Sequence, residues 1–354
     1  MSLSLFDDPL FSGLVGDAEI AALFTPRAVL DAMLRFEAAL AAAQAEAGLI
    51  DAASAAAVGR VVDDYRPDMA ALARGVARDG LPVPALVAAL REELPADMRK
   101  ALHLATTSQD LIDTALALRL AGLFEILGER IAGLLARFDE LDAAHGARRV
   151  MGVTRMREAL EIGLGERIAA WRSPLADLAG RLEGLRNDVC VVHLRGPVGD
   201  CRDLGEDPAA LAAAVGGRLG LGHDPARRHS DRGWVADTGH WLTRLAGALG
   251  KFGQDVALMA QDGVGQVRLT EGGSSSAMAH KKNPVAAETL VALARFTAVQ
   301  NGGLSQCLVH EMERSGAAWT LEWMILPQMA AAAGAATLLA GRVLDTTDFS
   351  GAAD

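Results

Sequence analysis

Residues 111–141 read LIDTALALRLAGLFEILGERIAGLLARFDEL, and this stretch decides the fold class. Apolar side chains recur in it at helical spacing with no Gly-Pro break: Ile112, Ala115, Leu118, Leu123, Ile126, Ile131, Leu134 and Phe138. At about 1.5 Å per residue such a helix is roughly 50 Å long, far longer than the average helix of a globular protein. We therefore expect a fold built around long helices.

The rest of the chain repeats this pattern. Helical spacing predicts long helices over residues 158–185 and 237–269, and two more on either side of residues 306–316. No alternating strand pattern of any length is found, so we predict an all-α fold in which long antiparallel helices form an up-and-down bundle. Wide apolar faces and many alanines on these helices favour packing against further chains.

The first part of the chain has shorter segments. Helices are predicted over residues 28–47 and 52–64. Dipeptides that end in proline, such as Arg66-Pro67 and Leu81-Pro82, separate the short helical segments of this part. We expect a small N-terminal helical domain over residues 1–105 and a bundle domain over residues 106–354.

Composition excludes several classes of function. The 354-residue chain is 51% hydrophobic and carries a net charge of −11, which argues against nucleic-acid binding. The longest uncharged apolar run near the C-terminus, residues 329–341, is too short to cross a bilayer, and no signal peptide is recognisable. Cys190, Cys201 and Cys307 show no CxxC spacing, which suits a reducing compartment. We expect a cytoplasmic protein with neither membrane nor nucleic acid as partner.

Residues 272–284, GGSSSAMAHKKNP, contain more side chains suited to catalysis or anion binding than any other stretch of this length. Glycines and serines give the backbone freedom, and Lys281 and Lys282 add positive charge. We expect a helix with Pro284 at its first position and Asn283 as its N-cap. Such a loop can close over an anion. On composition alone a solvated linker between helices is the more ordinary interpretation.

A second polar segment precedes the first long helix. Residues 103–114 read HLATTSQDLIDT, in which Thr107 or Ser108 can cap the helix. Free N–H groups and the positive end of the helix dipole then favour a bound carboxylate or phosphate. An ordinary N-cap without a ligand is the alternative.

Both segments resemble motifs of the fumarase/aspartase superfamily. The loop is similar to its GSSxMPxKxNP signature, and HxxxTSxD at the start of a long helix is similar to a second region that binds substrate carboxylate. The resemblance implies that His103, Thr107 and Ser108 bind substrate. It nominates Ser275, with Ser276 beside it, as the base. Lys281 and Asn283 would stabilise negative charge.

A third region, residues 148–171, resembles the GRTHxQxAxPxTxG stretch of the superfamily but departs from it. Arg155 stands where most members have a histidine, and Glu288 stands at the partner position, so the resemblance implies an Arg155–Glu288 ion pair. Arginine does not shuttle protons at neutral pH, so Arg155 is expected to bind carboxylate or position the loop. Arg157 is expected to replace the charge lost at Val153. Further departures are Glu161 at a proline position, Ser274 at a glycine and Ala279 at a proline.

The C-terminal segment VHEMERSGAAWTLEWMILP, residues 309–327, resembles HERSxGxWxxEW of one branch, the 3-carboxy-cis,cis-muconate cycloisomerases. Arg314 would bind a further carboxylate, while Trp319 and Trp323 are more simply explained as core residues. RRHSDRGWVADTG, residues 227–239, resembles an HTxRD segment of that branch, which makes His229 and Arg232 candidates. A lone histidine is nevertheless more often structural, and we assign His229 a supporting role. The resemblance covers nearly the whole chain and lacks the C-terminal helical domain of longer relatives.

The implied chemistry moves a proton on a carbon next to a carboxylate through an enediolate, which requires several cationic or N–H donors. The resemblance therefore implies a small polycarboxylate as substrate, and we expect no cofactor and no metal. Motifs for metalloproteases, nucleotide binding and serine hydrolases are missing from the sequence. Alternatives are a 3-sulfomuconate cycloisomerase, an adenylosuccinate or argininosuccinate lyase, and a catalytically silent binding homologue.

The motifs lie at different ends of the predicted helices. One chain is therefore not expected to bring them together, whereas a homotetramer could combine three chains at each site.

Overall fold

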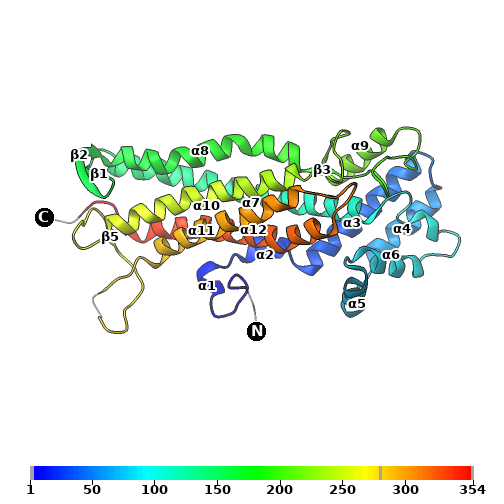
Figure 1. The fold of residues 1–354 in the computed structure, drawn as a ribbon, viewed down its shortest axis with the longest axis horizontal. Coiled ribbons are helices and arrows are strands. Elements are labelled where there is room, and N and C mark those ends of the chain that lie inside the picture. The colour runs from blue at the N-terminus through cyan, green and yellow to red at the C-terminus, as the bar shows by residue number, and fades with distance from the viewer. Residues whose placement is uncertain (1–3, 279–280, 352–354) are drawn as a thin grey trace.

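The computed structural model describes residues 4–278 and 281–351, and it confirms the all-α fold (Figure 1). The described helices are α1 Ser12–Val15, α2 Ala18–Leu23, α3 Pro26–Glu46, α4 Ala52–Asp64, α5 Met69–Asp79, α6 Val83–Glu92, η1 Arg99–Ala101, α7 Ser108–His145, α8 Leu164–Val189, α9 Pro208–Leu219, α10 Gly233–Met259, α11 Val285–Ser305, η2 Gln306–Leu308 and α12 Gly316–Asp345. The strands are β1 Arg149–Thr154, β2 Arg157–Gly163, β3 Val191–Val192, β4 Gly222–His223, β5 Arg268–Leu269 and β6 Thr347–Asp348.

Five long helices, α7, α8, α10, α11 and α12, run side by side along the long axis of the molecule and alternate in direction (Figure 1). The predicted long helix is confirmed and extends over Ser108–His145. Phe138 of α7, Trp171 of α8 and Phe252 of α10 meet edge to face inside this bundle, with the rings of Phe138 and Phe252 5.2 Å apart.

The pair α10 and α11 packs closely because glycine lines the contact. A Cβ added to Gly253 would lie 2.6 Å from the carbonyl oxygen of Ala287, and one added to Gly250 would lie 2.5 Å from the Cβ of Ala294. Neither helix backbone could approach so near with a larger residue at these positions. The spacing of α11, which follows the 272–284 loop, is thereby fixed relative to α10.

Two predicted boundaries are wrong. The helix expected from residue 158 begins at Leu164, because β1 and β2 form an antiparallel hairpin that turns at Arg155 and Met156. Side chains of β2 are exposed on both faces as far as Glu161, so no alternation of apolar and polar residues marks the strand. The helix expected to reach residue 269 ends at Met259, since Gly263 and Gly265 follow within six residues.

A second group of buried apolar residues lies under α3, α4, α6 and α9, at the end of the bundle opposite the hairpin (Figure 1). It includes Leu111, Ile112 and Ala115 from the first turns of α7. The first long helix thus belongs to both cores, and the division at residue 105 stays a prediction.

Helix α12 is long and apolar enough to cross a membrane by length and composition, unlike the shorter run considered in the sequence. In the structure 67% of its most apolar window is buried. Ala332, Ala333 and Ala336 are fully buried within the bundle, which marks α12 as a core helix.

Candidate active site

The start of α7 is organised by the buried carboxylate of Asp110. Its oxygens accept hydrogen bonds from Thr106 Oγ1 at 2.9 Å, Thr107 N at 3.0 Å, Gly196 N at 2.9 Å, Arg195 N at 2.8 Å and His229 Nε2 at 2.7 Å. Thr107, one of the two residues predicted to cap the helix, is the N-cap, and Ser108 is the first helical residue. One carboxylate therefore ties the helix start to the segment after β3 and to the connection before α10.

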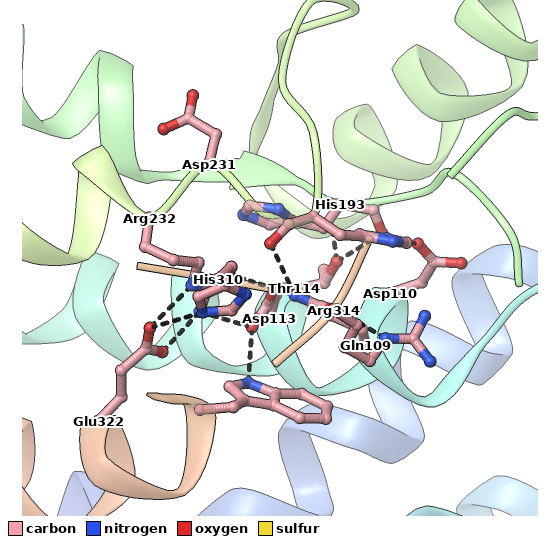
Figure 2. A network of polar contacts seen from close by, with 12 residues as sticks. Gln109, Asp110, Asp113, Thr114, His193, Asp231, Arg232, His310, Arg314 and Glu322 are labelled. Atoms are coloured by element: carbon pink, nitrogen blue, oxygen red, sulfur yellow. Dashed lines mark hydrogen bonds and ion pairs between the residues drawn. The ribbon is translucent and has the colours of Figure 1, made fainter. Parts of the chain in front are cut away.

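Gln109 is the second fixed residue of this helix start, and it is fully buried. Its Nε2 donates to Asp113 Oδ2 at 3.0 Å and to the carbonyl oxygen of His229 at 2.9 Å, while its Oε1 accepts from Arg314 Nε at 2.8 Å. Arg314 Nη2 also donates to the carbonyl oxygen of Pro197 at 3.2 Å. Figure 2 shows Arg314, which comes from a distant part of the chain, beside Gln109. The tertiary fold thus brings the predicted carboxylate ligand Arg314 to the start of α7.

Behind Gln109 lies a buried ionic triad. Arg232 donates to Asp113 through Nη1 at 2.6 Å and to Glu322 through Nε at 2.8 Å and Nη2 at 2.6 Å, joining α7, α10 and α12 (Figure 2). Burial by itself raises the pKa of Asp113, but the charge of Arg232 holds the pKa of that carboxyl below its ordinary value. Trp319 Nε1 donates to Asp113 at 3.3 Å, so this tryptophan is a core residue as expected. Arg232, a candidate ligand in the sequence, is instead a structural cation.

His103 lies in the segment that leads into α7. Its Nδ1 is 2.5 Å from the buried Glu37 Oε1 of α3, and its backbone adopts a left-handed φ of 59°. A non-glycine residue in that conformation is uncommon and is maintained by the surrounding contacts. We refer to His103, Thr107, Ser108, Gln109, Asp110, His229 and Arg314 as the α7 site.

The 272–284 loop, which we call the signature loop, is closed at its base by a backbone bridge. Gly273 and Asn283 exchange two hydrogen bonds of 2.9 Å each. Within the loop, Ser275 Oγ accepts hydrogen bonds from Met278 N at 3.1 Å and Ala277 N at 3.3 Å. Ser276 is exposed. Among the two nominated serines, Ser275 therefore has the backbone donors that would stabilise an oxyanion.

The two lysines of the signature loop differ in their contacts, and Asn283 is not the N-cap of α11. Lys281 is exposed, and the exposed Lys282 donates through Nζ to the carbonyl oxygen of Thr270 at 2.8 Å. Helix α11 begins at Val285 with Pro284 at its N-cap position, so the prediction that Asn283 caps this helix is wrong. Asn283 is committed to the backbone bridge instead. Ala279, one of the departures from the signature, lies outside the described residues.

Arg155 and Arg157 lie at the exposed turn of the β1–β2 hairpin, and Glu288 is exposed in the first turn of α11. Arg155 and Glu288 form no ion pair with each other within the described part of one chain, where Glu288 lies in the first turn of α11 and Arg155 in the hairpin. A pair between them stays a prediction for two chains of an assembly. Arg155 has a left-handed φ of 50°, which fixes it as a hairpin-turn residue.

The candidate residues fall at two ends of the bundle. The α7 site lies beside α3 and β3, whereas the hairpin and the signature loop lie at the opposite end, where α10 finishes and α11 begins (Figure 1). Helix α10 alone, 27 residues long, separates His229 from the signature loop. A 27-residue helix is about 40 Å long, so one chain does not bring the two groups together.

The sequence singled out neither Gln109 nor Asp113 and Glu322 as parts of the site. Asp110 was visible as the last letter of HxxxTSxD, yet its role as a hydrogen-bond hub was not. A signal did exist, because Gln109, Asp110 and Asp113 place three polar residues on the otherwise apolar early turns of a long helix. Buried polar residues in such a position require partners.

A long-helix bundle that carries a polar, arginine-bearing helix start and a Gly-Ser-Lys loop defines the class of superfamily lyases. The Lyase family model matches residues 16–297, and the chain belongs to this family, part of the fumarase/aspartase superfamily. It is therefore an enzyme of the lyase and cycloisomerase type.

The relatives agree with this assignment. The chain is 33% identical to the 3-carboxy-cis,cis-muconate cycloisomerase of Pseudomonas aeruginosa, over 90% of this chain and 71% of that protein. It is 32% identical to the nitrosuccinate lyase of Streptomyces davaonensis, over 97% of this chain and 76% of that protein. The crystal structure of the 3-carboxy-cis,cis-muconate lactonizing enzyme of Pseudomonas putida superimposes with a TM-score of 0.88 and 29% identity, covering 96% of this chain and 77% of that one.

Proposed function

We propose that the protein interconverts 3-carboxy-cis,cis-muconate and 4-carboxymuconolactone, a reaction of aromatic-compound catabolism. The observation that carries the proposal is the position of Arg314 at the start of α7. There Gln109 Oε1 accepts a hydrogen bond from Arg314 Nε at 2.8 Å. This leaves Nη1 of Arg314, as far as the described contacts go, for a ligand beside the Thr107–Ser108 helix start. A cation and a helix N-terminus together suit a carboxylate.

The substrate carries three carboxylates, and the candidate donors match that demand. Arg314, His103 and the helix start supply one group of donors, and Lys281, Asn283, Arg155 and Arg157 supply the other. Names of the relatives support the same substrate class. Glu288 then supports the loop from the start of α11.

Ser275 is the proposed base. Backbone donors on its Oγ favour the oxyanion, and closure of the loop beside Lys281 would remove water and add positive charge. In lactone formation, a carboxylate oxygen of the substrate attacks the conjugated double bond, and the neighbouring carbon receives the proton from the serine. Nucleophile and acceptor belong to one molecule, so orientation and charge stabilisation are the main contributions of the enzyme.

Assembly is a necessary part of this proposal. The α7 site of one chain must meet the signature loop and the hairpin of others, and a homotetramer in which three chains build each site achieves this. Analytical ultracentrifugation of the active enzyme is expected to show the tetramer. A fully active monomer would contradict the shared site.

The direct experiment incubates the purified protein with a panel of substrates. Muconate absorbance measures how much of the muconate is consumed. We expect 3-carboxymuconate to be consumed and to raise the melting temperature. The panel also includes 3-sulfomuconate, adenylosuccinate and nitrosuccinate, the last because of the relative that covers 97% of the chain. Consumption of one of these alone would replace the proposed substrate, and binding without consumption would indicate a silent homologue.

Alanine variants of the two serines test the base. Ser275→Ala is expected to lower kcat by about 100-fold or more, whereas Ser276→Ala is the matched control with a small effect. If both variants keep near-normal rates, the loop serines do not transfer the proton.

A further inference from the structure

A cavity of about 250 Å³ lies between the N-terminal helices and the bundle, where α3 and the start of α6 meet α7 and α12 (Figure 1). Most of its wall is apolar and includes Met33 of α3, Leu116 of α7 and Leu326 of α12. None of the described residues of the α7 site or the signature loop lines it. Pockets for drug-sized ligands measure about 300–1,000 Å³, so this cavity suits a smaller ligand, of about one ring.

Arg119 of α7 brings a positive charge into this wall. The side chain is half-buried, its Nε donates to the carbonyl oxygen of Ala115 at 3.1 Å, and its guanidinium carbon lies 5.4 Å from the centre of the Phe24 ring. Burial lowers the pKa of Arg119 to about 10, and no carboxylate among the described residues offsets that effect. The cation is thus held at the cavity by an aromatic ring and a carbonyl group.

The other two arginines of α7 have the kind of partner that Arg119 lacks. Both are half-buried like Arg119, and Arg130 pairs with Asp17 while Arg137 pairs with Asp345. A partly buried cation loses hydration, and an anion beside it compensates for that loss. The position of Arg119 therefore favours an anion that comes from outside the chain.

Glu322 of α12 is the acidic residue in the cavity wall, and it is not that anion. Its side chain is buried, and its two oxygens accept hydrogen bonds from Arg232 Nε at 2.8 Å and Nη2 at 2.6 Å. Both oxygens are thus used within the ionic triad. Since Glu322 would repel a second carboxylate, the charged end of a ligand is expected at Arg119 and its apolar end toward α12.

The α12 side of the cavity is aromatic. Trp323 lines it and stacks with Trp319, with the ring centres 5.0 Å apart. Trp319 Nε1 also donates to Asp113, which anchors this pair of rings to the ionic triad. Flat and rigid aromatic walls favour contact with another ring, and Phe24 offers a further ring at the charged end.

We propose that this cavity is a second ligand site that binds a small aromatic carboxylate, with the carboxylate on Arg119 and the ring against Trp323. Arg119 lies ten residues after Gln109, which is about 15 Å along α7, so a ligand bound here leaves the α7 site free. The site does not depend on the proposed function, and no covalent step takes place in it.

Calorimetric titration with 3-phenylpropionate and with its uncharged amide tests the role of Arg119. Wild type is expected to bind the carboxylate about 10-fold or more tightly than the amide, because the amide lacks the charge-assisted contact. Arg119→Met removes the cation and should bind the two compounds with equal affinity. Arg137→Met is the matched control and should keep the preference, because Arg137 belongs to the same helix but lies outside the cavity.

Arg119→Met is expected to fold normally, because the substitution breaks no ion pair within the described part of the chain. Its melting temperature should stay within a few degrees of wild type. Arg119→Gln also removes the charge, and it gives the same test if the methionine variant does not fold.

Two further variants locate the bound ligand. Arg314→Ala removes the proposed carboxylate ligand of the α7 site and should change the affinity for 3-phenylpropionate less than about twofold, since distant sites act independently. Binding is expected to change the tryptophan fluorescence, because Trp323 lines the cavity. Trp323→Phe should lose most of that change while the affinity changes less than about threefold, because a phenyl ring preserves the aromatic wall.

The outcomes that would overturn the second site are distinct. They are equal affinity of wild type for carboxylate and amide, an unchanged preference in Arg119→Met, and loss of binding in Arg314→Ala. A fluorescence change that persists in Trp323→Phe would place the ligand elsewhere. A wild type that binds neither compound would also overturn the site, and weaker self-association of Arg119→Met in the ultracentrifuge would then assign the cavity to a neighbouring chain. None of these results depends on muconate turnover, so the proposed function is tested separately.

Discussion

The α7 site and the signature loop are built in opposite ways. Side chains of the α7 site are buried or half-buried, and Asp110 alone joins three separate segments. Residues of the signature loop are largely exposed, and their described hydrogen bonds are local or go to the neighbouring Thr270 carbonyl. One chain therefore holds the α7 site in a network of contacts between distant segments, whereas the described contacts of the signature loop are confined to the loop and its immediate surroundings.

This contrast separates stability from activity. A buried network resists change because each broken bond leaves an unpaired polar group. An exposed loop tolerates substitution without loss of folding, and it can move during a catalytic cycle. Substitutions at the two ends should thus have different signatures.

The largest effect on stability is expected from the ionic triad behind the α7 site. Arg232→Met leaves Asp113 and Glu322 buried without their cation, which should lower the free energy of unfolding by about 3–5 kcal/mol. Urea melts measure this change. Arg149→Met is the control, because its pair with Glu161 is exposed and 3.7 Å long, and it should cost less than about 1 kcal/mol. Equal losses in both variants would remove the distinction between the two ends.

The largest effect on activity without loss of stability is expected at Lys281. Lys281→Ala should lower kcat about 100- to 1,000-fold, because the developing negative charge loses its cation, while the melting temperature stays unchanged. Lys282→Ala is the matched control, since that lysine binds the Thr270 carbonyl. Steady-state kinetics and thermal melts on both variants test this, and unchanged kinetics in Lys281→Ala would exclude this lysine from the mechanism.

Arg314 is expected to affect binding more than the chemical step. Arg314→Ala should raise KM about 10- to 100-fold with kcat changed less than about threefold, since a charge-assisted carboxylate contact is lost. Arg314→Lys keeps the charge but loses the Nε bond to Gln109, and its KM should lie between those of the other two proteins. A loss confined to kcat would contradict the assignment of Arg314 to substrate binding.

The smallest predicted effect concerns pH. Burial lowers the pKa of His193 in the folded state to about 4, below the value of about 6.5 in an unfolded chain. Between these values the unfolded state binds more protons, so stability falls as the pH decreases from about 6.5 to about 4. Melting temperatures across this range should fall less steeply in His193→Gln than in wild type. Identical slopes would show that other groups control the acid response.

Helix type and position were predictable from sequence where one face of a helix is buried. The long α7 and the shorter α3 and α4 followed from apolar periodicity, because burial of one face requires it. The β1–β2 hairpin could not be predicted in this way, because the exposed part of β2 buries neither face and leaves no periodic pattern in the sequence. Apolar periodicity does not predict the early end of α10 at Met259, because apolar residues continue past it, although Gly263 and Gly265 mark the break.

Candidate site residues followed from local motifs, and their partners did not. Thr107 and Ser108 were identifiable because a helix start needs nearby hydroxyl or carboxylate groups. Gln109 and Arg314 are 205 positions apart, and Asp110 and His229 are 119 apart, so no local pattern connects them. The prediction that Asn283 caps α11 was wrong because the backbone of Asn283 pairs with Gly273 and the helix begins two residues later, at Val285.

By itself, the sequence determined that this protein is a bundle of long helices with a capped polar helix start and a glycine-serine-lysine loop. Local periodicity, capping chemistry and charge are properties of neighbouring residues, and a sequence displays them directly. Only the tertiary structure decided that Asp110 orients His229 and that Gln109 holds Arg314. Those contacts arise when α7, α10 and α12 pack together, and packing joins residues that are far apart in the chain.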